Sequence, residues 1–100
     1  MLPKNRRPAH PGKILLEHFL NPLGITQARF VEHLEGTWTA SKLNNIIHEK
    51  RGITPAIALD FADALNTTPE FWMNLQFMYD LWNTAQNHQP ITPMDEALAM

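Results

Sequence analysis

The sequence predicts an all-α domain, and three observations support this class. Apolar residues recur at helical spacing through most of the chain. A helix start signal is repeated, because a threonine precedes a proline at Thr54-Pro55 and again at Thr68-Pro69. No alternation of apolar and polar residues is long enough to indicate a strand. The 100 residues suit one domain with a single apolar core.

The first helix is expected to begin at Pro11. Proline suits the first turn of a helix because the N–H that it lacks would have no partner there. Asn21-Pro22 is expected to stop this helix near Leu20, since proline disrupts a helix interior. Gly24 then follows as a turn residue.

The next two helices have threonines as candidate N-caps. Thr26 precedes a helix expected over about Gln27 to Leu34, and Thr39 precedes one expected over about Ala40 to Glu49. The turn Lys50-Arg51-Gly52 is expected to end the second of these helices.

The last two helices carry the repeated start signal. Thr54-Pro55 opens a helix that Asn66 is expected to close. Thr68-Pro69-Glu70 opens a helix expected to reach about Ala85, and the charge of Glu70 in its first turn complements the helix dipole.

Proline positions divide the chain into three parts. Residues 1–9 are polar and basic, and are expected to form a flexible arm. Residues 10–85 are expected to form the five-helix domain. Residues 86–100 are expected to be a loosely attached tail, with a short helical turn near Asp95 to Leu98.

The formal net charge of -2 conceals an uneven distribution. Residues 1–51 hold all eight basic residues and four acids, a net charge of +4, whereas residues 52–100 hold six acids and no Lys or Arg, a net charge of -6. A basic half indicates a surface for a polyanion. Many ordinary domains are also lopsided, so this asymmetry alone leaves both interpretations open.

The sequence does not indicate catalysis, a metal site or a cofactor. The chain has no cysteine, and its five histidines include no His-Glu-x-x-His pair. No nucleophile with its base and no close carboxylate pair is indicated. No apolar stretch approaches the length that a membrane span needs. We therefore expect a cytoplasmic protein that is not an enzyme.

The helix expected over residues 40–49 divides into an apolar and a polar face. The polar face, flanked by Lys42, holds Ser41, Asn44, Asn45 and His48. Such short side chains both donate and accept hydrogen bonds, as the reading of base edges in a DNA major groove requires. A polar surface without a partner has the same pattern, so this helix alone leaves both interpretations open.

The preceding helix favours the DNA interpretation. A short capped helix, a turn with glycine and a second amphipathic helix form a helix-turn-helix, whose second helix enters the major groove. Lys50 and Arg51 follow that helix and are placed to contact phosphates, as is Gln27 at a helix N-terminus. The predicted DNA-binding residues are Gln27, Thr39, Ser41, Lys42, Asn44, Asn45, His48, Lys50 and Arg51.

The last helix carries more aromatic surface than one face needs to bury. Part of this surface is expected in the core. Trp72, Tyr79 and Trp82 are predicted to form a homodimer interface, because Trp and Tyr are enriched at such interfaces. Core packing alone is the alternative interpretation.

Motifs within residues 10–82 match one known family. The most specific are His10-Pro11-Gly12-Lys13-Ile14-Leu15 and Thr67-Thr68-Pro69-Glu70-Phe71-Trp72-Met73-Asn74-Leu75-Gln76. Others are Pro22-Leu23-Gly24-Ile25-Thr26-Gln27, Leu43-Asn44-Asn45-Ile46-Ile47, Lys50-Arg51-Gly52-Ile53-Thr54 and Tyr79-Asp80-Leu81. With these motifs the chain resembles the HigA (VapI-like) antitoxins of bacterial toxin–antitoxin modules, within the phage-repressor-like (XRE) helix-turn-helix class.

The resemblance implies a function as well as a fold. It implies a five-helix, phage-repressor-like DNA-binding domain that dimerises, binds operator DNA to repress its own operon, and binds a RelE-like ribonuclease toxin. One segment departs from the family, because residues 35–39 form a turn about two residues longer than a helix-turn-helix of this class needs. The alternatives are a stand-alone regulator, and a toxin inhibitor without operator recognition.

Overall fold

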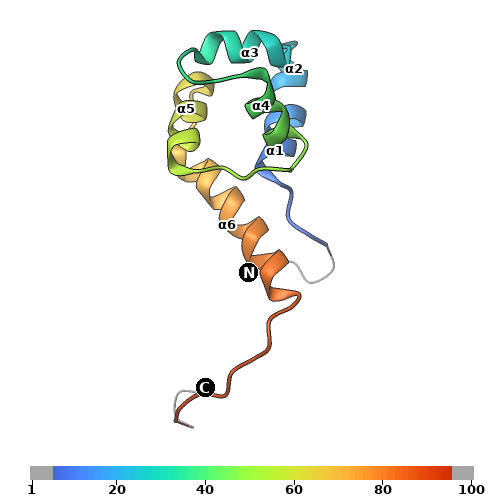
Figure 1. Cartoon of the computed structure of the whole chain (residues 1–100), viewed down its shortest axis with the longest axis vertical. Coiled ribbons are helices and arrows are strands. Elements are labelled where there is room, and N and C mark those ends of the chain that lie inside the picture. The colour runs from blue at the N-terminus through green and yellow to red at the C-terminus, as the bar shows by residue number, and fades with distance from the viewer. Residues whose placement is uncertain (1–5, 96–100) are drawn as a thin grey trace.

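The computed structural model describes residues 6–95, which form five helices around one core (Figure 1). The first helix joins α1 (Pro11–Ile14), the π-helical segment η1 (Leu15–Leu20) and α2 (Asn21–Leu23). The others are α3 (Gln27–Leu34), α4 (Ala40–Ile47), α5 (Pro55–Leu65) and α6 (Pro69–Ala85). The predicted all-α class is confirmed.

Threonine N-caps begin the last four helices. The side-chain oxygens of Thr26, Thr39, Thr54 and Thr68 each accept a hydrogen bond from the backbone N–H three residues later, at 3.1 to 3.3 Å. α5 and α6 also place a proline in the first turn. The predicted starts of all four helices are therefore confirmed.

The first helix continues past its predicted end. Its backbone stays helical to Leu23, and Gly24 then takes the left-handed conformation with a φ of 68°. The N–H of Asn21 donates to the carbonyl of Leu16, five residues earlier, which is the spacing of a π-helix. This wider turn accommodates the ring of Pro22, which would meet the carbonyl of a regular α-helical turn. The prediction that Asn21-Pro22 stops the helix is therefore wrong.

α4 ends at Ile47 instead of the predicted Glu49. Glu49 has a φ of 61°, which no right-handed helix contains. Its N–H donates to the carbonyl of Ile46 at 3.1 Å, and the N–H of Lys50 donates to that of Asn45 at 2.8 Å. These two bonds form a Schellman motif, which ends the helix and turns the chain away.

The core lies where the five helices meet. Phe61 of α5 and Trp72 of α6 are fully buried at its centre, with ring centroids 5.2 Å apart. The indole N–H of Trp72 donates to the hydroxyl of Thr67 at 2.8 Å. The assignment of Trp72 to a dimer interface is therefore corrected, because a side chain without exposed surface cannot contact a second chain.

α6 extends beyond the helical body, and the tail continues from its end (Figure 1). The described residues span 55 × 24 × 22 Å, so the projecting helix and tail set the long axis. Residues 86–95 are exposed and contain no helix. The helical turn predicted near Asp95 to Leu98 lies almost wholly outside the described residues. Within residues 6–95, no helix is long and apolar enough to cross a membrane.

Candidate nucleic-acid interface

α4 turns a polar face to solvent and an apolar face to the core. Leu43 and Ile46 are fully buried. Ser41 and Asn44 are exposed, and Asn45 is half-buried at the edge of the same face. The structure therefore brings together on one surface the short polar side chains that the sequence groups by helical spacing.

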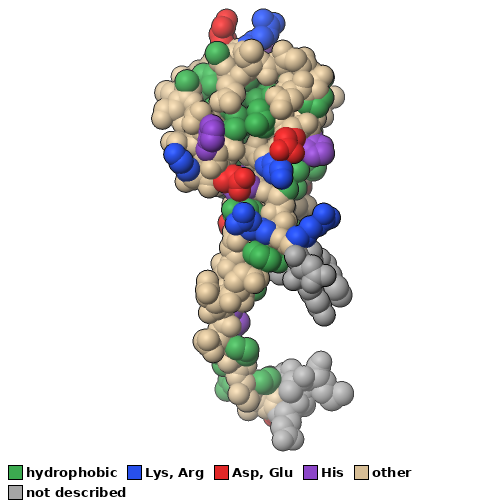
Figure 2. Space-filling view, turned by 90° about the vertical axis from the view of Figure 1, so that its right-hand side faces the viewer, with side chains coloured by type: hydrophobic (Ala, Val, Ile, Leu, Met, Phe, Trp, Pro, Cys, Tyr) green, Lys and Arg blue, Asp and Glu red, His purple; other side chains and the backbone are tan. Residues whose placement is uncertain are grey.

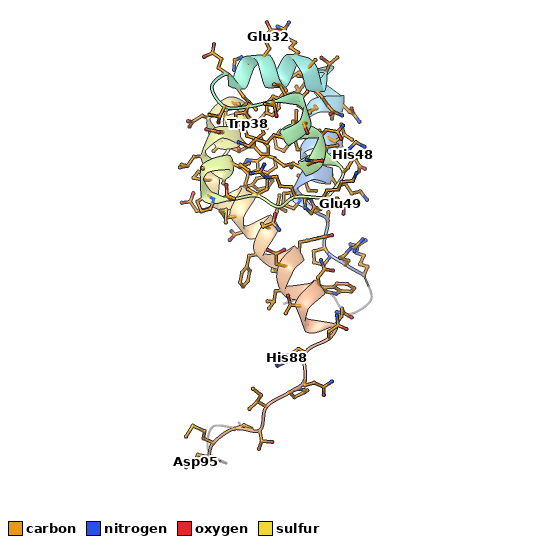
Figure 3. All side chains as sticks on the ribbon, in the orientation of Figure 1. Glu32, Trp38, His48, Glu49, His88 and Asp95 are labelled. Atoms are coloured by element: carbon orange, nitrogen blue, oxygen red, sulfur yellow. The ribbon has the colours of Figure 1, made fainter. Side chains whose placement is uncertain are left out.

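His48 lies directly after the last residue of α4. Its Nδ1 is 2.9 Å from the carbonyl oxygen of Asn44, so this nitrogen donates the hydrogen bond, and Nε2 is left for another partner. The ring is exposed, and it lies on the side of the body that carries α1 (Figure 3). His48 thus extends the polar face from the C-cap instead of from within the helix.

Basic residues lie at both ends of α4. Lys50 and Arg51 are exposed after the Schellman turn. Near the first turn, the ammonium of Lys42 lies 4.1 Å from the centre of the Trp38 ring. Lys and Arg side chains are spread over the face of the molecule shown in Figure 2, which is the side of α1 and α4. A polyanion along α4 would therefore meet positive charge at either end of the polar face.

Two further predicted residues lie at helix starts. Gln27 is the first residue of α3 and is half-buried. Thr39 is exposed, and its hydroxyl accepts the N–H of Lys42 at 3.1 Å. Thr39 therefore has a capping role that fixes where α4 begins.

The turn of residues 35–39, between α3 and α4, carries Trp38 into the core. Trp38 is 8% exposed and stacks on Phe61, with centroids 5.5 Å and planes 27° apart. Its indole N–H donates to Oδ2 of Asp60 at 2.7 Å. Trp38 thus anchors the entry of α4 to α5, and its buried ring is not free to contact bases.

The backbone of α1 packs closely against the backbone of α4 at Gly12 and Ile46. A Cβ on Gly12 would overlap the carbonyl oxygen of Ile46, so only glycine fits between the two backbones. His10 caps the same helix, because its Nδ1 accepts the N–H of Gly12 at 2.9 Å. The motif His10-Pro11-Gly12 therefore combines a cap, a helix start and a close packing contact.

The surroundings of His10 favour its neutral form. Burial lowers its pKa below the usual 6.5, and the nearby carboxylates of Glu49 and Asp80 offset this only in part, while Arg7 adds to it. The ring packs edge-on against Tyr79, with centroids 4.8 Å apart. The acceptor role of Nδ1 toward Gly12 fits this neutral form.

α6 holds the segment that follows α4. Oε1 of the buried Gln76 accepts the N–H of Ile53 at 2.6 Å, and its Nε2 donates to Oδ1 of Asp80 at 2.8 Å. Gly52 lies directly against the same side-chain amide. Sequence reasoning missed Gly12, Gln76 and Trp38 as supports of α4, because their partners are distant along the chain.

The remaining predicted dimer residues are half-buried. Tyr79 contacts His10, and the guanidinium of Arg7 lies 5.4 Å from its ring centre. Trp82 is half-buried near the end of α6. Sequence reasoning missed Phe77 and Leu81, which are 59% and 42% exposed and one helical turn apart. Their i to i+4 spacing was the available signal.

A capped helix, a turn and an exposed polar helix braced by the core define a helix-turn-helix domain of the phage-repressor-like (XRE) class. No family model matches the chain. Over 84 residues it is 38% identical to antitoxin HigA-1 of Vibrio cholerae, covering 84% of this chain and 77% of that protein. Over 89 residues it is 37% identical to virulence-associated protein I of Dichelobacter nodosus, covering 88% and 81%.

A solved structure of an antitoxin also resembles this chain. The Pseudomonas aeruginosa antitoxin HigA, solved with the higBA promoter, superposes with a TM-score of 0.77 at 35% identity, covering 89% of this chain and all of that one. The chain therefore belongs to the HigA (VapI-like) family of helix-turn-helix antitoxins. Its relatives are antitoxins and transcription regulators.

Proposed function

We propose that this chain is a dimeric DNA-binding antitoxin that represses its own operon and neutralises a RelE-like ribonuclease toxin in the cytoplasm. The observation that carries the DNA-binding part is the exposed polar face of α4, whose opposite side is buried. The bracing contacts of Gly12, Trp38 and Gln76 hold this face in a fixed orientation. A relative of the same fold solved with its promoter supports the proposal.

In the proposed complex, two α4 helices enter successive major grooves about 34 Å apart on a pseudo-palindromic operator. The proposed base contacts come from the polar face: Ser41, Asn44, Asn45 and His48. Asn44 and Asn45 suit adenine, because a side-chain amide can pair with N6 and N7 together. The proposed phosphate contacts come from residues at its edges: Gln27, Thr39, Lys42, Lys50 and Arg51.

Association of two chains is proposed to use the projecting half of α6. Phe77 and Leu81 expose apolar surface on one side of this helix, and Trp82 and Tyr79 lie in the same half. Aromatic and apolar surface of this kind is typical of the centre of an interface. A two-fold axis there would place two copies of α4 on the same DNA molecule.

Toxin neutralisation is supported by family membership and by charge. Residues 52–100 carry a net charge of -6, which suits a basic ribonuclease partner. This acidic half is separate in sequence from α4, so toxin and DNA need not compete for the same residues.

A gel shift with the chain's own promoter DNA at about 150 mM salt tests the DNA-binding part. Specific retention is expected, and its absence favours a toxin inhibitor without operator recognition. Co-expression with the protein encoded by the adjacent gene tests the antitoxin part. Rescue of growth is expected, and growth inhibition that this chain cannot relieve contradicts the antitoxin function.

A further inference from the structure

The turn of residues 35–39 between α3 and α4 brings the ring of Trp38 against the side chain of Lys42. Glu35 and Gly36 both have positive φ values, 58° and 60°, and reverse the chain after α3. Trp38 then reaches α5, where it bonds to Asp60 and stacks on Phe61. The ring is therefore fixed by its attachment to the backbone, by the hydrogen bond to Asp60 and by stacking on Phe61.

The same ring also contacts α4. The ammonium of Lys42 lies 4.1 Å from the ring centroid of Trp38, well within the distance for a cation–π interaction. A lysine side chain has a flexible four-carbon stem, so a free lysine loses conformational entropy when it binds a phosphate. Contact with a fixed ring removes part of that entropy before DNA arrives.

Lys42 lies at a position where an ordered ammonium group could bind a DNA phosphate. It lies beside the polar face of α4, next to Ser41, and its backbone N–H is capped by Thr39. No other basic residue belongs to α4, since Lys50 and Arg51 follow its C-terminal end. Lys42 therefore supplies the positive charge at the N-terminal edge of the polar face.

We propose that Trp38 is a positioning residue for DNA binding. It fixes the entry of α4 to α5 and holds the Lys42 ammonium in place to bind a DNA phosphate. Asp60 supports this role by orienting the indole. The proposal rests on the proposed operator binding, and it assigns to the turn of residues 35–39 a function in placing the proposed phosphate-binding lysine of α4.

The first measurement uses the free protein. The ε-methylene protons of Lys42 are expected to resonate upfield in a carbon–proton NMR spectrum, because the Trp38 ring shields them. Trp38→Leu should abolish the shift. Asp60→Asn should retain it, because the amide oxygen still accepts the indole N–H. Wild-type Lys42 protons at the ordinary lysine position would overturn the proposal.

The second measurement follows promoter binding across salt concentrations. Lys42→Met should reduce the slope of log affinity against log salt by about 0.9 for each phosphate that is no longer neutralised, and so by about 1.8 for a dimer. Trp38→Leu should weaken binding in the same direction. In the Trp38→Leu background, Lys42→Met should have a smaller effect on affinity than in wild type, because the lysine is no longer preorganised for its phosphate.

Lys50→Met is the matched control. Lys50 lies at the other end of α4 and is exposed, so its substitution should weaken binding equally with Trp38 or leucine present. If Trp38→Leu does not fold, Asp60→Ala replaces it, since Asp60 is exposed while its removal frees the indole N–H.

The outcomes separate this proposal from the proposed function. If the wild-type chain binds its promoter and Lys42→Met weakens binding equally in both backgrounds, the positioning role of Trp38 is overturned alone. If the wild-type chain does not bind its promoter, both the proposed operator binding and the positioning role of Trp38 are contradicted. Coupling between Trp38 and Lys42, without coupling between Trp38 and Lys50, supports the proposal.

Discussion

Gln76 on α6 accepts the backbone N–H of Ile53 at 2.6 Å. Ile53 lies just beyond the Lys50 and Arg51 pair, so this bond ties the segment that follows α4 to α6, the helix proposed to join two chains. The helix proposed for dimer formation and the segment that follows the helix proposed for DNA binding are therefore joined through one buried side chain.

Gln76→Leu should lower the free energy of unfolding by about 1–3 kcal/mol, because it leaves the N–H of Ile53 buried without its acceptor. Urea unfolding followed by circular dichroism measures this change. Gln86→Leu is the matched control, since Gln86 is exposed and should change stability by no more than about 0.5 kcal/mol. Equal effects of the two substitutions would contradict the role given to Gln76.

Gly12→Ala should disturb α4 as well as stability. The added Cβ meets the backbone of Ile46, so α1 and α4 must separate, at a cost of about 1–3 kcal/mol. Affinity for promoter DNA should also decrease, because α4 is displaced. Gly24→Ala is the control: its φ of 68° makes alanine strained, yet nothing lies within 4 Å. A decrease in promoter affinity as large in Gly24→Ala would argue against a specific role of the close approach at Gly12.

Stability should fall on acidification below pH 6.5 because of His10. Its pKa is lowered in the folded chain, so the unfolded chain binds the proton first as pH falls. The stabilisation is therefore fully present above pH 6.5 and is lost as pH falls through the folded-state pKa. Thermal unfolding across pH 4.5 to 7.5, from about two units below to one unit above the ordinary histidine pKa of about 6.5, measures this loss of stability.

His10→Asn isolates this effect from the other histidines. Asparagine is a good N-cap without a titrating ring, so its oxygen can still accept the N–H of Gly12. The difference in stability between wild type and variant should shrink as pH falls below 6.5. A difference that stays constant with pH would show that His10 does not titrate as proposed.

Glu49→Gly should stabilise the protein. Glu49 has a φ of 61° at the end of α4, where a side chain costs about 1 kcal/mol that glycine avoids. Its carboxylate accepts the hydroxyl of Tyr79 at 3.5 Å, an exposed and weak interaction, and the substitution also removes the charge that partly offsets the lowering of the His10 pKa. A rise in melting temperature is expected by calorimetry, whereas a fall would mean that the interaction with Tyr79 outweighs the backbone strain.

The helix starts were predictable because their signals are local. A threonine and the N–H three residues later fold together whatever the rest of the chain does, as Thr26 and Thr39 show. Two helix ends were not predictable from local signals. A π-helical turn accommodates Pro22 within the first helix, and Glu49 takes a left-handed conformation that glycine adopts more readily.

The polar face of α4 was predictable for the same reason, since residue spacing alone places Asn44 and Ser41 together. The residues that hold α4 in place were not, because their partners lie 22 to 23 residues away, as in Trp38 with Asp60 and Gln76 with Ile53. Trp72 shows the converse error, in which an aromatic residue predicted for an interface fills the core instead.

Base reading by the polar face of α4 is measured by fluorescence anisotropy with labelled promoter DNA and with scrambled DNA of equal length, at about 150 mM salt. Asn44→Ala should lower affinity for the promoter by about 1–3 kcal/mol and leave scrambled DNA unaffected. Lys50→Met should weaken both. An equal decrease on both DNAs from Asn44→Ala, or no decrease on either, would contradict base reading by α4.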